Sequence, residues 1–112
     1  VGNNTTTGAV AVTMTSNSST WVGSKFYGTT NFTKTGSSVD DFIGGNIFYG
    51  PSCYFKTTVT AARWRMGNSN PAPDIFYNAT FDANGKGGTN NNFIVLYTIT
   101  EIKVAQAAPT IP

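Results

Sequence analysis

The scarcity of helix-forming residues constrains this chain more than any other feature of its sequence. It contains one Leu (Leu96) and one Glu (Glu101), whereas Thr, Asn, Gly and Ser together supply 50 of its 112 residues. Leu, Glu, Gln and Lys are residues that favour helices, while Thr, Val, Ile, Phe and Tyr suit the pleated surface of a sheet. The composition therefore predicts an all-β fold.

The length and the spacing of turn residues indicate how the strands are organised. A chain of 112 residues is long enough for one domain with a single core. We expect seven to eight strands at spacings of roughly 8–15 residues, which is typical of an antiparallel β-sandwich with a jelly-roll-like arrangement. This single domain spans residues 1–112, with a polar leader and candidate assembly strand at 1–15 and a Pro-containing tail at 105–112. No internal repeat is recognised.

Alternation of apolar and polar residues predicts which side chains share a face of a strand. Segment 9–15 places three apolar side chains together: Val10, Val12 and Met14. In segment 52–66 the apolar face shifts by one residue at Ala61–Ala62, which predicts a β-bulge. Beyond that bulge, Trp64 and Met66 occupy the face opposite Arg63 and Arg65.

The last third of the chain is expected to form two long strands. Segment 74–82 alternates, with Ile75, Tyr77, Ala79 and Phe81 on one face. Segment 93–104 is apolar on both faces in its first half, so we expect it to be the central strand. The Gly- and Asn-rich segment 83–92 between them is expected to be the tip of a hairpin.

Residues suited to catalysis or metal binding are few. The chain has no His, and its one Cys, Cys53, lies among aromatic residues and is expected to be a small buried apolar residue. Asp40 and Asp41 follow a Gly/Ser segment, where adjacent Asp residues are more often turn and capping residues than Ca²⁺ ligands. We therefore expect no catalytic residues, no metal site and no cofactor, and we predict that the protein is not an enzyme.

Charge and sequons limit the partners and the location. Only 11% of the residues are charged, the net charge is +2, and the basic residues are scattered, so direct nucleic-acid binding is not expected. No apolar run is long enough to predict a membrane span. Five Asn-x-Ser/Thr sequons permit glycosylation and favour an extracellular or cell-surface location: Asn3, Asn4, Asn17, Asn31 and Asn78.

These features favour a structural protein that binds copies of itself. A surface with few charges opposes self-association only weakly. We expect a subunit of an extracellular filament or pilus-like fibre, in which a donor strand at 9–15 extends the sheet of a neighbouring subunit. The expected interface residues are Val10, Val12, Met14, Arg63 and Arg65.

Two other functions are consistent with the sequence. The first is a viral capsid or capsid-projection domain in a virion, which shares the Thr-, Asn- and Gly-rich composition. The second is a carbohydrate-binding module, because aromatic side chains can stack on sugar rings, although aromatic residues are also needed to fill a core that lacks Leu. The aromatic candidates are Trp21, Tyr27, Tyr49, Tyr54, Trp64 and Tyr77.

Overall fold

A computed structural model describes residues 2–15, 18–36, 39–57, 63–82, 94–96 and 99–103. The prediction of an all-β fold is confirmed, since every regular element among these residues is a strand. The strands are β1 (Thr5–Thr6), β2 (Val10–Met14), β3 (Thr20–Trp21), β4 (Lys25–Phe26), β5 (Thr30–Lys34), β6 (Val39–Phe42), β7 (Ile47–Phe48), β8 (Cys53–Thr57), β9 (Arg63–Met66), β10 (Asp74–Tyr77), β11 (Ala79–Asp82), β12 (Ile94–Leu96) and β13 (Thr100–Lys103).

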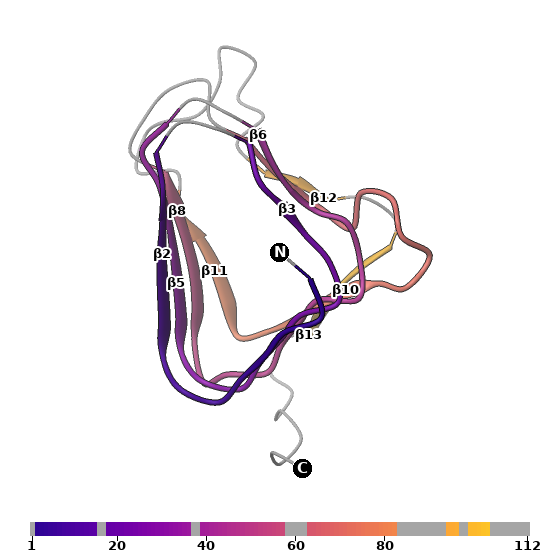
Figure 1. Cartoon of the computed structure of the whole chain (residues 1–112), viewed down its shortest axis with the longest axis horizontal. Helices are drawn as coiled ribbons and strands as arrows, with labels where there is room; N and C mark the ends of the chain where they lie inside the picture. The colour runs from indigo at the N-terminus through magenta and orange to yellow at the C-terminus, as the bar shows by residue number, and fades with distance from the viewer. Residues whose placement is uncertain are drawn as a thin grey trace.

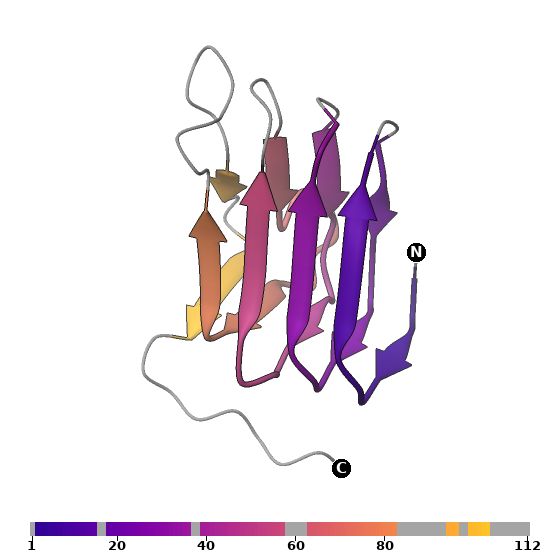
Figure 2. The same ribbon diagram turned by 90° about the vertical axis from the view of Figure 1, so that its left-hand side faces the viewer.

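The strands wind into a β-solenoid, seen nearly end-on in Figure 1. Each coil gives one strand to each of three sheets, whose orders are β1-β4-β7-β10-β13, β11-β8-β5-β2 and β12-β9-β6-β3. The four strands β2, β5, β8 and β11 run side by side in Figure 2. The first coil is therefore β1–β3 and the next is β4–β6.

The predicted antiparallel β-sandwich with a jelly-roll-like arrangement is wrong, because all strand pairs in the described part of the chain are parallel. Alternation shows which side chains share a face, but not which strand lies alongside. A parallel neighbour requires a crossover of about a dozen residues or more. In this chain the other two sides of each coil supply that crossover.

The expected long strand at 74–82 is two strands that belong to different sheets. The chain turns at Asn78, whose φ is 50°, and β10 pairs with β7 and β13 whereas β11 pairs with β8. The turn resets the alternation, so Phe76 of β10 is fully buried while Ile75 is only half-buried. The prediction that Ile75 faces the core is therefore wrong.

The expectation of a central strand at 93–104 is also wrong. Strand β12 lies at one end of its sheet, next to β9, and β13 belongs to a different sheet. Strands β11 and β12 are in separate sheets, so they do not form the predicted hairpin. Segment 83–92 and the predicted bulge at Ala61–Ala62 lie outside the described residues.

Stacked aromatic rings fill the space between the three sheets. Phe26, Phe48 and Phe76 occupy the same position in successive coils, with ring centroids 4.7 Å apart at both steps and interplanar angles of 6° and 7°. Phe32 and Phe55 stack in the same way at 5.1 Å. Cys53, Trp64 and Met66 are buried as predicted, and the core is aromatic because Leu is nearly absent.

The corners of the coils depend on residues that allow close approach of the backbone. A Cβ atom at Gly50 would collide with the backbone oxygen of Gly28 in the preceding coil, and one at Gly28 would collide with the oxygen of Gly8. Each aromatic pair before these corners is Phe-Tyr, giving Phe-Tyr-Gly at 26–28 and 48–50 and Phe-Tyr-Asn at 76–78. This Phe-Tyr repeat is a sequence signal of the solenoid, and its uneven spacing does not fit a fixed period.

Candidate functional site

The outer edge of the first coil is the main candidate site. Strands β1, β2 and β3 each lie at the end of their sheet, so one edge of each has no partner strand among the described residues. The Val10 N–H donates to the Thr29 carbonyl at 2.9 Å, and Met14 accepts from Thr35 N–H, which places both on the side of β5. Because backbone groups alternate along a strand, the N–H groups of Ala11 and Thr13 lie on the unpaired edge.

The apolar residues of the expected interface lie on the inner face of this coil. Val10 and Val12 are half-buried and pack against the core, and Met14 is buried. Strand β2 pairs over its whole length with β5 of the same chain, with Val12 opposite Phe32. These side chains therefore form the end of the core, where Val10 and Val12 are only partly covered by their own chain and Met14 is covered.

The two arginines of the expected interface lie on the outer face of β9, as alternation predicts. Arg65 forms a two-pronged ion pair with Asp41 on the neighbouring strand β6, with Nη2 2.5 Å from Oδ2 and Nε in contact with Oδ1. Asn68 donates to the same carboxylate at 3.1 Å. Arg63 lies opposite Val39 on this face. Arg65 therefore joins two successive coils.

Three tyrosines form a second column of stacked rings on the outer side of the sheet that contains β4, β7 and β10. Tyr27 and Tyr49 are 4.7 Å apart between ring centroids, and Tyr49 and Tyr77 are 5.5 Å apart. Burial raises the pKa of Tyr49, and its two tyrosine neighbours add to the effect. Tyr49 is stacked on both of its faces and Tyr77 is only 8% exposed, so the column offers mainly ring edges and the hydroxyl groups of Tyr27 and Tyr49 to a ligand.

The other aromatic candidates for sugar binding do not share this surface. Trp21 is 8% exposed and Trp64 is fully buried, so both belong to the core. Tyr54 is half-buried on the outer face of β8, in a different sheet from the tyrosine column. The structure therefore brings together three of the six candidates.

A buried polar column lies where β4, β7 and β10 begin. Ser24, Asn46 and Asp74 occupy equivalent positions and are fully buried. Asn46 Nδ2 donates to Asp74 Oδ1 at 2.7 Å and Asn46 Oδ1 accepts from Ser24 N–H at 3.0 Å, while Asp74 Oδ2 accepts from Gly67 N–H at 2.6 Å. Burial raises the pKa of Asp74 and these hydrogen bonds oppose that shift. Hydrogen bonds along this column therefore link the three successive coils that contain β4, β7 and β10.

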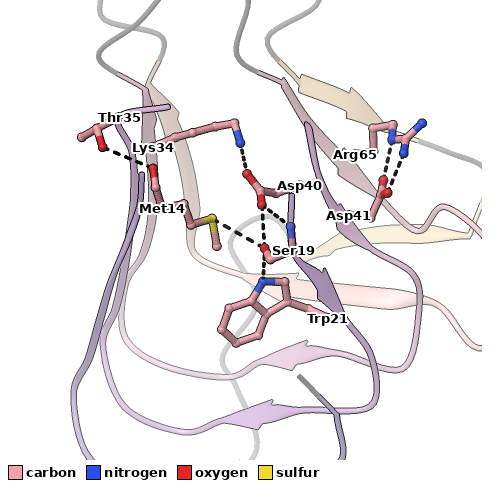
Figure 3. Close-up of polar contacts among 8 residues, drawn as sticks. All are labelled: Met14, Ser19, Trp21, Lys34, Thr35, Asp40, Asp41 and Arg65. Atoms are coloured by element: carbon pink, nitrogen blue, oxygen red, sulfur yellow. Dashed lines mark hydrogen bonds and ion pairs between the residues drawn. The ribbon is translucent and has the colours of Figure 1, made fainter. Parts of the chain in front are cut away.

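A second polar cluster lies inside the core, between β5 and β6. Figure 3 shows Lys34 and Asp40 pointing toward one another, with Nζ in contact with Oδ2. Both side chains are fully buried. Asp40 Oδ1 accepts from Ser19 N–H at 2.7 Å and from Ser19 Oγ at 2.6 Å, and Lys34 Nζ lies 5.3 Å from the centre of the Trp64 ring. Asp40 and Asp41 are strand residues of β6, so their expected place in a loop is wrong.

The candidate glycosylation sites are spread over the surface. Asn3, Asn4, Asn31 and Asn78 are exposed, and Asn17 lies outside the described residues. Asn31 projects from the middle of β5, whereas Asn3 and Asn78 occupy turns with φ of 56° and 50°. The exposed sites are thus found on two corners and on one outer sheet face.

The described residues offer few groups for other chemistry. They contain no cluster of three or more His, Cys, Asp or Glu side chains that could hold a metal ion. Burial raises the pKa of Cys53 to about 12, which keeps this thiol protonated and unreactive near neutral pH. The part of the chain that the structure describes also contains no helix with the length and hydropathy of a membrane span.

Sequence reasoning did not identify Lys34 and Asp40 as a pair. Lys is among the residues least often fully buried, so its residue type argues against a core position for Lys34. The available signal was alternation within 30–34, which puts Lys34 on the same face as Phe32.

Comparison with known proteins adds no assignment, since no family model, no curated protein and no solved structure matches this chain.

Proposed function

We propose that this chain is a structural segment of an extracellular protein assembly, a filament or pilus-like fibre, in which a second copy extends the three sheets of the solenoid. The observation that carries the proposal is that β1, β2 and β3 all lie at the ends of their sheets. An unpaired strand edge is a template for another strand. Three such edges around one core would bind the complete cross-section of another coil.

The opposite end of the solenoid supports a second copy as the occupant. Ile102 of β13 continues the inner row of Phe26, Phe48 and Phe76, and it is 40% exposed. Thr6 of β1 begins that row. Head-to-tail stacking would place Thr6 against Ile102 of a second copy and so extend the five-stranded sheet directly. The other two sheets have one strand fewer, so their ends would face each other across the space of one strand. Contacts between two different surfaces of one chain do not close on themselves when repeated by translation, so they generate a fibre.

The proposal is tested by blocking one edge without disturbing the pairing inside the chain. Thr13→Pro removes an N–H that lies on the unpaired edge of β2, a position where a strand tolerates proline. Thr13→Val is the matched control because it keeps the N–H. Light scattering after size-exclusion chromatography and negative-stain microscopy measure assembly, and circular dichroism with thermal melting measures folding.

We expect the wild type and Thr13→Val to form fibres in increasing number as concentration rises. Thr13→Pro should remain monomeric with a sheet spectrum and a melting temperature close to those of the wild type. A wild type that stays monomeric at all concentrations contradicts the proposal. Fibre formation by Thr13→Pro at the wild-type level contradicts the role of this edge.

A further inference from the structure

The contact between Lys34 and Asp40 is unusual because both charged side chains are fully buried in an aromatic core. The two residues lie on consecutive strands of one coil, β5 and β6, and meet across its interior (Figure 3). The face of the Trp64 ring lies beside the Lys34 amine. Removing two charges from water carries a large cost, which their mutual attraction offsets only partly. A reaction that consumes both charges would remove this cost.

The carboxyl group of Asp40 is held in a fixed orientation. Ser19 donates two hydrogen bonds to Oδ1, from its backbone N–H and from its hydroxyl group. The Ser19 Oγ in turn accepts a hydrogen bond from Trp21 Nε1 at 2.9 Å, which directs the hydroxyl proton toward Asp40. The other carboxyl oxygen, Oδ2, contacts Lys34 Nζ. Oδ1 of Asp40 thus accepts two hydrogen bonds from Ser19, whereas Oδ2 contacts the Lys34 amine.

The buried environment of Lys34 favours a nucleophilic role for its amine. Burial lowers the pKa of Lys34 from 10.5 to about 8, so the neutral amine is accessible near physiological pH. Two reacting groups held in contact in a water-poor core have a very high effective concentration, which favours bond formation between them.

We propose that Lys34 Nζ and Asp40 Cγ condense to an amide, forming a covalent cross-link inside the solenoid. A proton passes from the Lys34 ammonium group to Asp40 Oδ2, which leaves a neutral amine and a carboxylic acid. Nζ then attacks Cγ and forms a C–N bond, and the negative charge that develops on Oδ1 is stabilised by the two Ser19 donors. A second proton moves from Nζ to the Oδ2 hydroxyl group, which leaves as water. No oxidant or reductant is required.

Another Lys–carboxylate pair in the chain provides an internal comparison. Lys103 Nζ lies 3.0 Å from Glu101 Oε2, but the side chain of Glu101 is 48% exposed. The Glu101 carboxylate is therefore open to solvent, and no donor pair equivalent to Ser19 is seen on it among the described residues. The amide is therefore expected at Lys34 and not at Lys103.

Intact mass and digestion with trypsin under denaturing conditions test the proposal. The expected wild-type mass is lower than the sequence mass by one water molecule. Trypsin cleaves after unmodified Lys, so the wild type should yield the uncut peptide 26–56, short of one water, with fragment ions that join Lys34 to Asp40. Cleavage after Lys103 should be normal.

Variants assign the chemistry to these groups. Lys34→Arg keeps the positive charge but lacks the amine, so the full sequence mass and cleavage at position 34 should return. Ser19→Ala removes one donor from Oδ1, and we expect slower loss of water after refolding, by about 10-fold or more. The N–H donor remains in this variant, so the reaction should slow rather than stop.

The wild-type measurement alone can overturn the proposal. A folded wild type that retains the full sequence mass and is cut after Lys34, even after long incubation, excludes the cross-link. Loss of one water with normal cleavage after Lys34 also excludes it, because that pattern indicates dehydration of an Asp within its own backbone. Neither outcome depends on whether a variant folds.

Discussion

The first and second coils contribute equivalent strands to the three sheets, yet their inner side chains differ in burial. Val10 and Val12 of β2 are half-buried, whereas Thr30 and Phe32, which lie opposite them on β5, are 1% and 0% exposed. Among the described residues, the second coil has a neighbouring coil on both sides, and the first has one on a single side. At these two positions burial thus depends on the number of adjoining coils, as in other structures in which each repeat contacts only its neighbours, whereas Met14 and Trp21 of the first coil are buried.

The largest expected effect comes from truncating an inner side chain in each of the two coils. Phe32→Ala should lower the free energy of unfolding by about 3–5 kcal/mol, because Phe32 stacks on Phe55 in a closed part of the core. Val12→Ala should lower it by about 1 kcal/mol, because Val12 is already partly in contact with water. Urea unfolding followed by intrinsic fluorescence measures both. Equal losses would show that the first coil is covered in solution.

A smaller effect is expected at the corners, where two glycines provide a matched pair. Gly50→Ala places a methyl group against the Gly28 backbone and should cost about 1–3 kcal/mol. Gly8→Ala meets no atom within 4 Å and should change stability little. Thermal melting of the two variants checks this. A stable Gly50→Ala protein would mean that the coils can separate locally to admit a side chain.

The smallest expected effect concerns the buried polar column. Asp74→Asn should cost about 1 kcal/mol at neutral pH, because the amide group keeps one acceptor but places an N–H₂ group against Gly67 N–H. Burial raises the pKa of Asp74, so the folded state binds its proton more tightly than the unfolded state. Wild-type stability should therefore fall as pH rises from near 3.8 through the folded pKa.

In that pH range Asp74→Asn should show a flatter dependence than the wild type. Asp41→Asn is the control for loss of a carboxylate that is partly exposed on the outer face. Unfolding by urea at a series of pH values provides the comparison. If Asp74→Asn and the wild type have the same pH dependence, burial of Asp74 does not contribute to it.

The sequence correctly predicted an all-β fold and several strand faces, but not the bounds of the strands or their neighbours. Scarce helix formers were sufficient to predict an all-β fold, and alternation placed Trp64 and Met66 opposite Arg63 and Arg65. Alternation has the same period in parallel and antiparallel sheets, so it could not decide between a sandwich and a solenoid. The information that decides between them lay in the repeated Phe-Tyr pairs at positions 26, 48 and 76, whose spacing is uneven.

The polar clusters were harder to predict for a physical reason. Asp40 is an inner residue because Ser19, Trp21 and Lys34, which come from other strands and connections, gather around it. A charged residue on an inner face is stable only with such partners, and they become apparent only when the coils are stacked. In contrast, Val10, Val12 and Met14 could be assigned to one face from their own segment alone.

The uneven length of the coils indicates where the sequence of this chain can accept insertions. Val10 pairs with Thr30, Thr30 with Cys53 and Cys53 with Ala79, so equivalent positions are separated by 20, 23 and 26 residues while the stacking register is kept. The additional residues lie between strands, where they do not alter which side chains face inward. Genetic insertions at these connections would leave the inner columns aligned, whereas a single insertion within a strand would reverse its inner and outer faces. The length and sequence of the connections between strands can therefore change while the inward-facing side chains keep their positions.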